Sequence, residues 1–169
     1  MPAGHRQPEY GRTAQYGQTF RSVRLRPFEP RDQREARAVL SAGFREHFGD
    51  AYDEAGDHDL DDLSAMFSAG LFLVAELDGH IAGTGGLVLH DDGTGEVRRM
   101  STRRDHRRQG VGSAVLDALL EEARARGCRR VVLGTEAVWD DAGSFYRAHG
   151  FREYDRPGAS IWFELLLTS

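Results

Sequence analysis

The sequence predicts one α/β (α+β) domain, in which a mixed, mostly antiparallel sheet of about six or seven strands is flanked by about four helices. Three observations support this class. Apolar segments of strand length alternate with longer amphipathic segments of helix length. The turn sequences Asp78-Gly79 and Asp91-Asp92-Gly93 join strands in the way that hairpin turns do. A long helix then separates two later strands, which therefore connect through a crossover.

The first elements are a strand and two helices. Residues 22–26 form a short strand, and Pro30-Arg31-Asp32 opens a helix that continues to about Phe48. Asp32 and Glu35 have the spacing of a capping box at the start of this helix. A loop over residues 50–62 leads into a short helix that carries Leu60, Leu63, Met66 and Phe67.

Three strands follow, at residues 71–76, 80–89 and 96–102. The first two are joined by Asp78-Gly79, a strong signal for a two-residue hairpin. The second strand contains glycines, which weaken a strand or mark a bulge in it: Gly83, Gly85 and Gly86.

A helix, a buried strand, a further helix and two closing strands complete the domain. The first helix begins at Gly110 and ends at Gly127, where glycine is the preferred residue. Residues 131–135 form a strand that is apolar throughout, as in a sheet covered on both faces. Asp140 caps a helix that continues to Ala148 and is ended by Gly150. The closing strands are expected at residues 151–154 and 160–167.

Length and composition favour a single cytoplasmic domain over residues 21–169, preceded by a flexible tail over residues 1–20. No stretch of about 18 apolar residues is present to span a membrane, and the start lacks the pattern of a secretory signal. The single cysteine, Cys128, agrees with a reducing compartment. We interpret it as a packed small hydrophobe; the alternative is a reactive thiol.

The charges are unevenly distributed, although the net charge is −5. All basic residues other than histidine are arginine, which suggests a GC-rich bacterial genome and excludes a P-loop, since that motif needs lysine. Residues 98–130 hold ten arginines and four acids, whereas residues 50–62 hold seven acids and no arginine. The first region suits a polyanion, and the second suits a cation or simply solvent.

The segment Arg107-Arg108-Gln109-Gly110-Val111-Gly112-Ser113, between a strand and a long helix, has the features of an anion site. The first N–H groups of a helix have no partner within the helix, and the helix dipole favours negative charge there. Two glycines allow a ligand to approach the backbone closely. A plain turn between strand and helix is the alternative. A dinucleotide-binding loop is disfavoured, because its third glycine would fall at Val115.

These residues resemble a known family. Arg107-x-x-Gly110-x-Gly112 is similar to the Gln/Arg-x-x-Gly-x-Gly/Ala signature of the GNAT superfamily of N-acetyltransferases, and residues 96–106 resemble its preceding strand and loop. Phe145-Tyr146 followed by Gly150-Phe151 resembles a further family element. The similarity extends over about residues 22–167 and implies a GNAT-like fold that uses acetyl-CoA and no metal.

The resemblance implies roles for individual residues. The amides of residues 108–113 would bind the CoA diphosphate, the backbone of Met100 and Thr102 would pair with the pantetheine arm, and Tyr146 would protonate the departing thiolate. Glu96 falls where several family members place a general base. The implied cofactor-binding residues are Met100, Ser101, Thr102, Arg107, Arg108, Gln109, Gly110, Val111, Gly112 and Ser113.

Each assignment has a structural alternative. Glu96 can serve only as the ion-pair partner of Arg98 or of another strand's arginine, and Tyr146 can be a core residue. The acids that follow His58 suggest a metal site, but a solvated loop explains them better, and we expect no metal. Many relatives carry asparagine at the position of Trp139, where it contacts the pantetheine arm. That contact is expected to be absent here.

The resemblance implies transfer of acetyl from acetyl-CoA directly to an amine of a small molecule or peptide in a ternary complex. Residues 50–62 would lie over the acceptor pocket and attract a cationic acceptor; alternatively, they only keep a loop soluble. A non-catalytic acyl-CoA-binding sensor or interaction module is the alternative function. We expect no nucleic-acid partner, since the chain is acidic, with a pI near 5.8. The oligomeric state stays open, a homodimer included.

Overall fold

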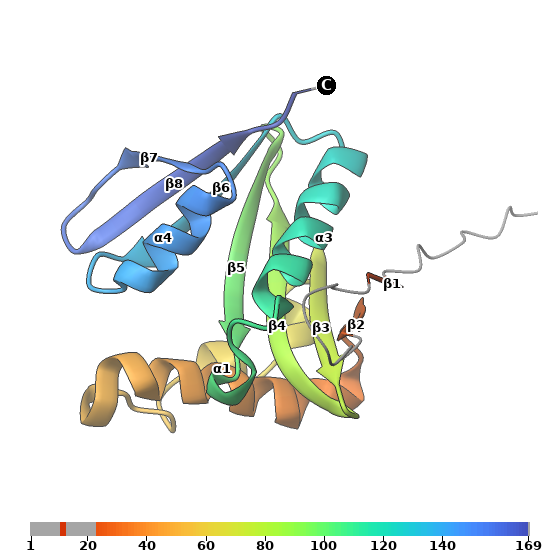
Figure 1. The fold of residues 1–169 in the computed structure, drawn as a ribbon, viewed down its shortest axis with the longest axis vertical. Helices are drawn as coiled ribbons and strands as arrows, with labels where there is room; N and C mark the ends of the chain where they lie inside the picture. The colour runs from red at the N-terminus through yellow and green to blue at the C-terminus, as the bar shows by residue number, and fades with distance from the viewer. Residues whose placement is uncertain (1–10, 13–22, 169) are drawn as a thin grey trace, which may run out of the picture.

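A computed structural model describes residues 11–12 and 23–168. The flexible tail expected over residues 1–20 lies outside the described residues, apart from Gly11 and Arg12, which pair with the first long strand. The strands are β1 (Gly11–Arg12), β2 (Val23–Pro27), β3 (Leu71–Leu77), β4 (His80–Leu89), β5 (Thr94–Thr102), β6 (Arg130–Glu136), β7 (Arg152–Asp155) and β8 (Ser160–Leu166). The helices are α1 (Gln33–Phe48), α2 (Leu63–Met66), α3 (Val111–Ala125) and α4 (Asp140–Ala148), with short 3-10 turns η1 (Pro30–Asp32), η2 (Gly49–Ala51), η3 (His58–Leu60) and η4 (Arg104–His106) (Figure 1).

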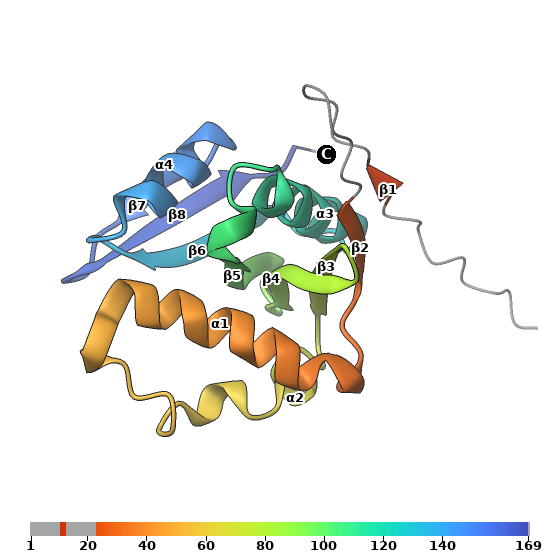
Figure 2. The same ribbon diagram turned by 60° about the horizontal axis from the view of Figure 1, so that its bottom comes forward.

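The strands form one mixed sheet in the order β1-β2-β3-β4-β5-β6-β8-β7. All neighbours are antiparallel except β5 and β6, which are parallel and connected through α3. This confirms the predicted fold class, including the crossover. Helix α1 lies on one face of the sheet, and α3 and α4 lie on the other (Figure 2).

Two apolar clusters fill the space between the helices and the sheet. The larger one joins α3 and Tyr146 of α4 to the strands, and the smaller one lies under α1 and α2. The amphipathic patterns of the helices therefore account for both clusters. Cys128 packs against the larger cluster, which confirms its interpretation as a small hydrophobe.

The pairing of β4 with β5 is irregular at the glycines of β4, and one of these glycines lets α3 approach the sheet closely. The pairing of β4 with β5 shifts register between Thr84 and Gly86, and Arg99 on the opposing strand has a φ of 57°. A Cβ atom on Gly85 would lie 2.5 Å from both Met100 Sδ and Val115 Cγ1. Glycine at this position is therefore required for the packing of α3 on the sheet.

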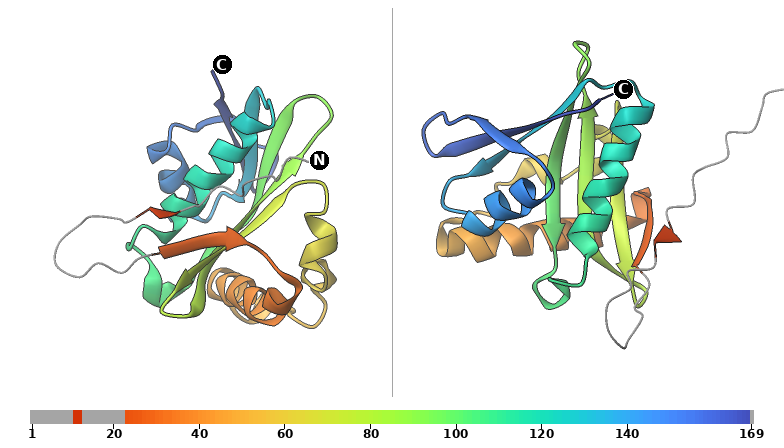
Figure 3. Two further views of the ribbon diagram at one scale, coloured as in Figure 1. Left: turned by 90° about the vertical axis from the view of Figure 1, so that its right-hand side faces the viewer. Right: turned by 45° about the horizontal axis from the view of Figure 1, so that its top comes forward.

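Strands β5 and β6 pair over only three residues each and then separate. Their register begins at Thr94 with Arg130 and ends at Glu96 with Val132. Beyond this point, residues 97–102 of β5 and 133–136 of β6 diverge, as Figures 1 and 3 show. We call these two segments the splay. Within the splay, the main-chain edges by which β5 and β6 face each other are not paired with each other.

The predicted side-chain caps of two helices were wrong, and two predicted helix ends are confirmed. Asp32 occupies the N-cap position of α1 as expected, but it does not form the predicted capping box: its carboxylate binds Arg26 and the N–H of Glu29, while Glu35 accepts a hydrogen bond from the N–H of Ile81. Asp140 is the first residue of α4, and the N-cap is Trp139. Gly127 and Gly150 have φ values of 76° and 89° directly after α3 and α4.

Candidate active site

Consecutive unpartnered N–H groups line the loop between β5 and α3. None of the hydrogen bonds among the described residues uses the N–H of any residue from 108 to 113 as donor. The first bond of the helix runs from the N–H of Ala114 to the carbonyl of Gly110. Arg108 and Gly110 adopt left-handed φ values of 61° and 80°, which turn the loop back toward the helix axis. The result is a set of donors at the positive end of α3.

Arginines surround this loop, but they differ in whether they are free. Arg107 donates to both carboxylate oxygens of Glu46 on α1, at 2.6 Å each, and this bond holds the pKa of Glu46 below its usual value. Arg104 and Arg108 have no hydrogen bond or ion pair with another described residue. They therefore remain available to an anion. Of the ten arginines in 98–130, several others pair with nearby acids: Arg98, Arg99, Arg103, Arg126 and Arg130.

A shallow pocket of about 320 Å³ adjoins the loop on the α1 side. Main-chain and side-chain atoms of α1 form one wall, and the end of β5 with η4 forms the other. Its lining residues are Val39, Ala42, Gly43, Arg45, Glu46, Thr102, Arg103, Arg104 and Arg107. No sequence pattern predicted Glu46 at this site, because it lies 61 positions from its partner Arg107.

The three predicted residues at the end of β5 differ in where their side chains point. Met100 packs toward α3, and Thr102 Oγ1 lies 3.5 Å from the position of a Cβ on Gly112. Ser101 points the other way and donates to the carbonyl of Val39 on α1 at 3.4 Å. All three belong to the splay, so the open edge of β5 offers their main-chain groups to a ligand.

Tyr146 is buried among aromatic rings on the α4 side of the sheet. Its ring centroid lies 5.2 Å from that of Phe145, 5.9 Å from that of Phe151 and 6.2 Å from that of Phe163. No hydrogen bond to its hydroxyl is found in the described part of the chain. Burial raises the pKa of Tyr146, so its hydroxyl keeps a proton at neutral pH.

Three buried side-chain polar atoms have no hydrogen-bond partner among the described residues: His106 Nδ1, Thr135 Oγ1 and Trp139 Nε1. They lie on η4, on β6 within the splay, and directly before α4. Buried polar atoms normally have partners, so an unpartnered group of this kind indicates a ligand or water. Trp139, which replaces the family's asparagine, thus presents a buried N–H donor. Its ring stacks on His47 of α1 at 4.4 Å.

Glu96 is buried at the last β5–β6 pair, and both of its carboxylate oxygens have partners. Arg98 donates to the two oxygens at 2.7 and 2.9 Å, and His90 Nε2 lies 2.8 Å from Oε2. Burial alone would raise the pKa of Glu96, but the bonds from Arg98 and His90 outweigh it and lower the pKa. The pairing with Arg98 is the structural alternative that the sequence left open.

The acids of residues 50–62 are mostly occupied within the chain. Glu54 pairs with Arg45, Asp59 with Arg99, and Asp61 with Arg37 and His58. Asp53, Asp57 and Asp62 accept hydrogen bonds from the N–H of Gly56, the hydroxyl of Tyr52 and the N–H of Ala65. Only Asp50 has no such partner among the described residues. Within the same residues no group of side chains is suited to hold a metal ion, and none of the helices has both the length and the apolar composition of a membrane span.

Proteins of known sequence and structure resemble this chain. N-acetyltransferase YsnE of Bacillus subtilis is 38% identical over 81 residues, which cover 47% of this chain and 53% of that protein. N-acetyltransferase 8B of Homo sapiens is 31% identical over 100 residues, which cover 56% of this chain and 44% of that protein. The chain thus spans about half the length of these two relatives.

Solved structures share the fold. An acetyltransferase of the GNAT family from Staphylococcus aureus superposes with a TM-score of 0.78 at 21% identity, over 86% of this chain and 99% of that one. The PaiA N-acetyltransferase of Thermoplasma acidophilum, solved in complex with coenzyme A, gives a TM-score of 0.76 at 17% identity, over 86% and 99% of the two chains.

The family model described as the acetyltransferase (GNAT) family matches residues 37–151, which include the loop after β5, the splay and Tyr146. This span exceeds half of the chain. The resemblance stated from the sequence is therefore confirmed, and the chain belongs to the GNAT acetyltransferase family.

Proposed function

We propose that this protein is an acetyl-CoA-dependent N-acetyltransferase that acetylates a primary amine of a small molecule or peptide. The observation that supports this most is the run of unpartnered N–H groups from residue 108 to 113, next to the splay. A diphosphate satisfies such donors, and an extended arm fits the open edge of β5. Relatives solved with coenzyme A or acetyl-CoA support the same co-substrate.

In this proposal, the chain's residues have distinct tasks. The N–H groups of residues 108–113, with Arg104 and Arg108, bind the diphosphate. Main-chain groups of Met100 and Thr102 align the pantetheine arm along β5. Thr135 Oγ1 in the splay and Trp139 Nε1 before α4 lack partners among the described residues, and a bound ligand would supply them.

Tyr146 gives a proton to the departing sulfur. Its hydroxyl is protonated at neutral pH because burial raises its pKa. Transfer is direct within a ternary complex, and the only cysteine does not suit a covalent route, since burial raises the pKa of Cys128 as well. The role of general base expected of Glu96 stays a prediction. Because Arg98 donates to both of its carboxylate oxygens, Glu96 also holds the Arg98 side chain in place beside the splay. For residues 50–62 we propose no acceptor role, because six of the seven acids have partners.

Calorimetry with coenzyme A and a thiol-release assay with acetyl-CoA and a panel of amines test this function. We expect binding of coenzyme A, and thiol release that depends on the amine. Initial-rate lines that intersect, with no acetylated protein in the mass spectrum, are expected for direct transfer. Binding without turnover would support the acyl-CoA-binding module instead, and no binding would refute both functions.

A further inference from the structure

One face of the C-terminal half of the sheet stands beside the splay, opposite α4. Along β6, Val131, Leu133 and Thr135 point to the α4 side, and the alternate positions, including Gly134 and Glu136, point to the other side. Because Val132 pairs with Glu96, these positions share a face with Glu96. Helix α1 packs on the β4 and β5 part of this face, whereas Gly134 is exposed to solvent.

Trp162 of β8 lies flat on Gly134. The two residues are opposite each other in the β6–β8 pair. A Cβ on Gly134 would lie 3.0 Å from both Cε2 and Cζ2 of the indole and 3.3 Å from Cδ2. These near-equal distances mean that one face of the ring covers the glycine. Trp162 is half-buried, so part of its indole stays accessible as an apolar platform beside the splay.

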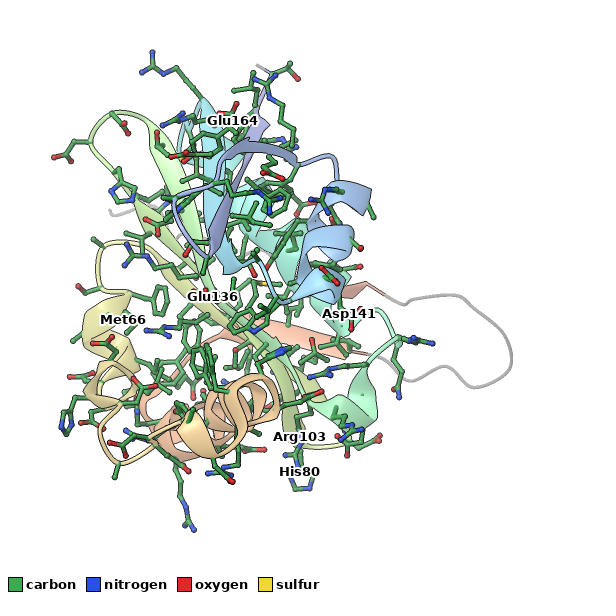
Figure 4. All side chains as sticks on the ribbon, turned by 90° about the vertical axis from the view of Figure 1, so that its left-hand side faces the viewer. Met66, His80, Arg103, Glu136, Asp141 and Glu164 are labelled. Carbon is green, nitrogen blue, oxygen red and sulfur yellow. The ribbon has the colours of Figure 1, made fainter. Side chains whose placement is uncertain are left out.

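Glu136 stands at the end of β6 next to this platform. It is half-buried, and its carboxylate has no hydrogen bond or ion pair with any described residue. Figure 4 shows it near the end of β6, on the side of helix α1. The other carboxylates that β5, β6 and β8 present on this face are neutralised: Glu96 by Arg98 and His90, and Glu164 by Arg130 and Arg152. Among the described carboxylates that β5, β6 and β8 present on this face, Glu136 is thus the one without a partner.

We infer that Glu136 and Trp162 form the acceptor site, and that the acceptor is a primary amine with one positive charge and a flat apolar body. The inference rests on the proposed function and adds its substrate class. The carboxylate binds the ammonium, and the indole face binds the apolar body and attracts the cation. A polyamine suits the site less well, because one free carboxylate matches one ammonium.

The same carboxylate is placed to start the reaction. An ammonium nitrogen has no lone pair, so it first transfers one proton to a Glu136 oxygen. The freed lone pair attacks the thioester carbonyl carbon, the C–N bond forms, and the C–S bond breaks. The sulfur takes the proton of Tyr146, and the nitrogen gives its second proton to water. Glu136 and Tyr146 recover their starting states by proton exchange with solvent, so acetyl-CoA and the ammonium become the amide, free coenzyme A and one proton.

The test compares variants with three amines at saturating acetyl-CoA: 2-phenylethylamine, butylamine and spermidine. For the wild type we expect kcat/KM to be highest for 2-phenylethylamine, by about tenfold, which corresponds to one additional well-packed apolar group. Glu136→Gln is expected to lower kcat/KM for this amine about 100-fold, the contribution of a positioned base. The Kd of acetyl-CoA, measured by calorimetry, should stay unchanged. Trp162→Ala should remove the preference for 2-phenylethylamine and lower kcat/KM for butylamine much less, because butylamine loses only the attraction of the indole for its charge.

Two controls separate this site from other carboxylates. Glu96→Gln removes the carboxylate predicted from the sequence, and it should slow the reaction less than Glu136→Gln does. Glu122→Gln removes an acid paired with Arg126 at the far end of α3 and should have no effect. An unchanged kcat/KM for Glu136→Gln, or a wild-type preference for spermidine, would overturn the inference while leaving the acetyltransferase function intact. If no amine is acetylated, the proposed function fails. The site is then tested by calorimetry of 2-phenylethylamine with the CoA-loaded wild type and Glu136→Gln: weaker binding to the variant would support the site, and equal binding would overturn it.

Discussion

The guanidinium of Arg107 and the carboxylate of Glu46 form a two-pronged ion pair, with both N···O distances at 2.6 Å, which ties the loop before α3 to helix α1. The arginine of the family signature is therefore already neutralised by the chain itself. Its contribution to anion binding depends on how far Glu46 offsets its charge. Arg104 and Arg108, which have no such partner among the described residues, are the stronger candidates for direct phosphate contact.

Opposite effects are expected from the two ends of this ion pair. Glu46→Gln should strengthen coenzyme A binding about twofold, since one negative charge about 8 Å from a phosphate costs about 0.5 kcal/mol in water. Arg107→Gln should weaken binding by a similar factor. Both residues are partly exposed, so the free energy of unfolding should change by less than about 1 kcal/mol. Calorimetry at low and high salt measures the affinities. Equal weakening by both variants would mean that the pair acts only by holding the loop in place.

The two glycines of the loop should respond differently to alanine. Gly110 has a φ of 80°, so Gly110→Ala is expected to destabilise the protein by about 1–2 kcal/mol. A Cβ on Gly112 would meet its nearest atoms, in Phe145 and Thr102, at an ordinary 3.5 Å. Gly112→Ala should therefore keep the stability and instead weaken coenzyme A binding about tenfold, by disturbing about one hydrogen bond to the diphosphate. Urea titrations and calorimetry separate the two effects. Unchanged affinity in Gly112→Ala would argue against close approach of a ligand there.

The buried pair of Arg26 and Asp32 makes stability depend on pH. Asp32 accepts two hydrogen bonds from Arg26, at 2.7 and 2.8 Å, and these bonds hold the pKa of Asp32 below its usual value. The carboxylate therefore stabilises the fold fully above its unfolded pKa of about 3.9, and this contribution is lost as the pH falls through the lower folded pKa. Asp32→Asn should cost about 2 kcal/mol at pH 7, because Arg26 would lose the charge of one carboxylate partner while it keeps its hydrogen bonds to Glu76.

Urea titrations of the wild type and Asp32→Asn at pH 7 and pH 3 check this dependence. The difference between the two proteins should shrink at the lower pH. Arg31→Gln is the matched control: it breaks the exposed pair with Glu29, and it should cost less than about 0.5 kcal/mol. A difference between wild type and Asp32→Asn that grows on acidification would contradict the argument.

Most of the fold could be predicted because its determinants are local. Hairpin turns such as Asp78-Gly79, helix-ending glycines such as Gly127, and the spacing of apolar residues each act within a few positions. The capping box at Asp32 was predicted wrongly for the opposite reason. Asp32 is bound by Arg26 of β2, and Glu35 is bound by the N–H of Ile81, 46 positions away. No local pattern contains these partners.

The candidate site, too, could be predicted only where its residues lie close together in the sequence. The loop of residues 107–113 and Tyr146 could be identified from motifs that lie in continuous sequence. The partner of Arg107 is on α1, and the platform of Trp162 on Gly134 depends on the register of β6 with β8. Glu136 has no motif around it. Two features distinguish it from the other acids. The alternation of side chains along β6 places it on the same face as Gly134, and it has no ion-pair partner among the described residues.

Tyr146 offers the sharpest distinction between a catalytic and a structural residue. Tyr146→Phe keeps the buried ring and removes only the hydroxyl, which has no hydrogen bond within the described part of the chain. The free energy of unfolding should therefore stay within about 0.5 kcal/mol of the wild type, since no hydrogen bond is lost. If the hydroxyl protonates the departing sulfur, kcat should fall about 100-fold or more. Thiol release and urea titration measure the two quantities.

The choice of acyl donor extends this test of Tyr146. An activated acetyl thioester of low thiol pKa needs little protonation of its sulfur, so the deficit of Tyr146→Phe should shrink with such a donor. A loss of activity that is the same with every donor, accompanied by weaker coenzyme A binding, would instead indicate that the hydroxyl helps to bind the co-substrate. Unchanged kcat would assign Tyr146 to the core alone, where it packs against Phe151 and Phe163.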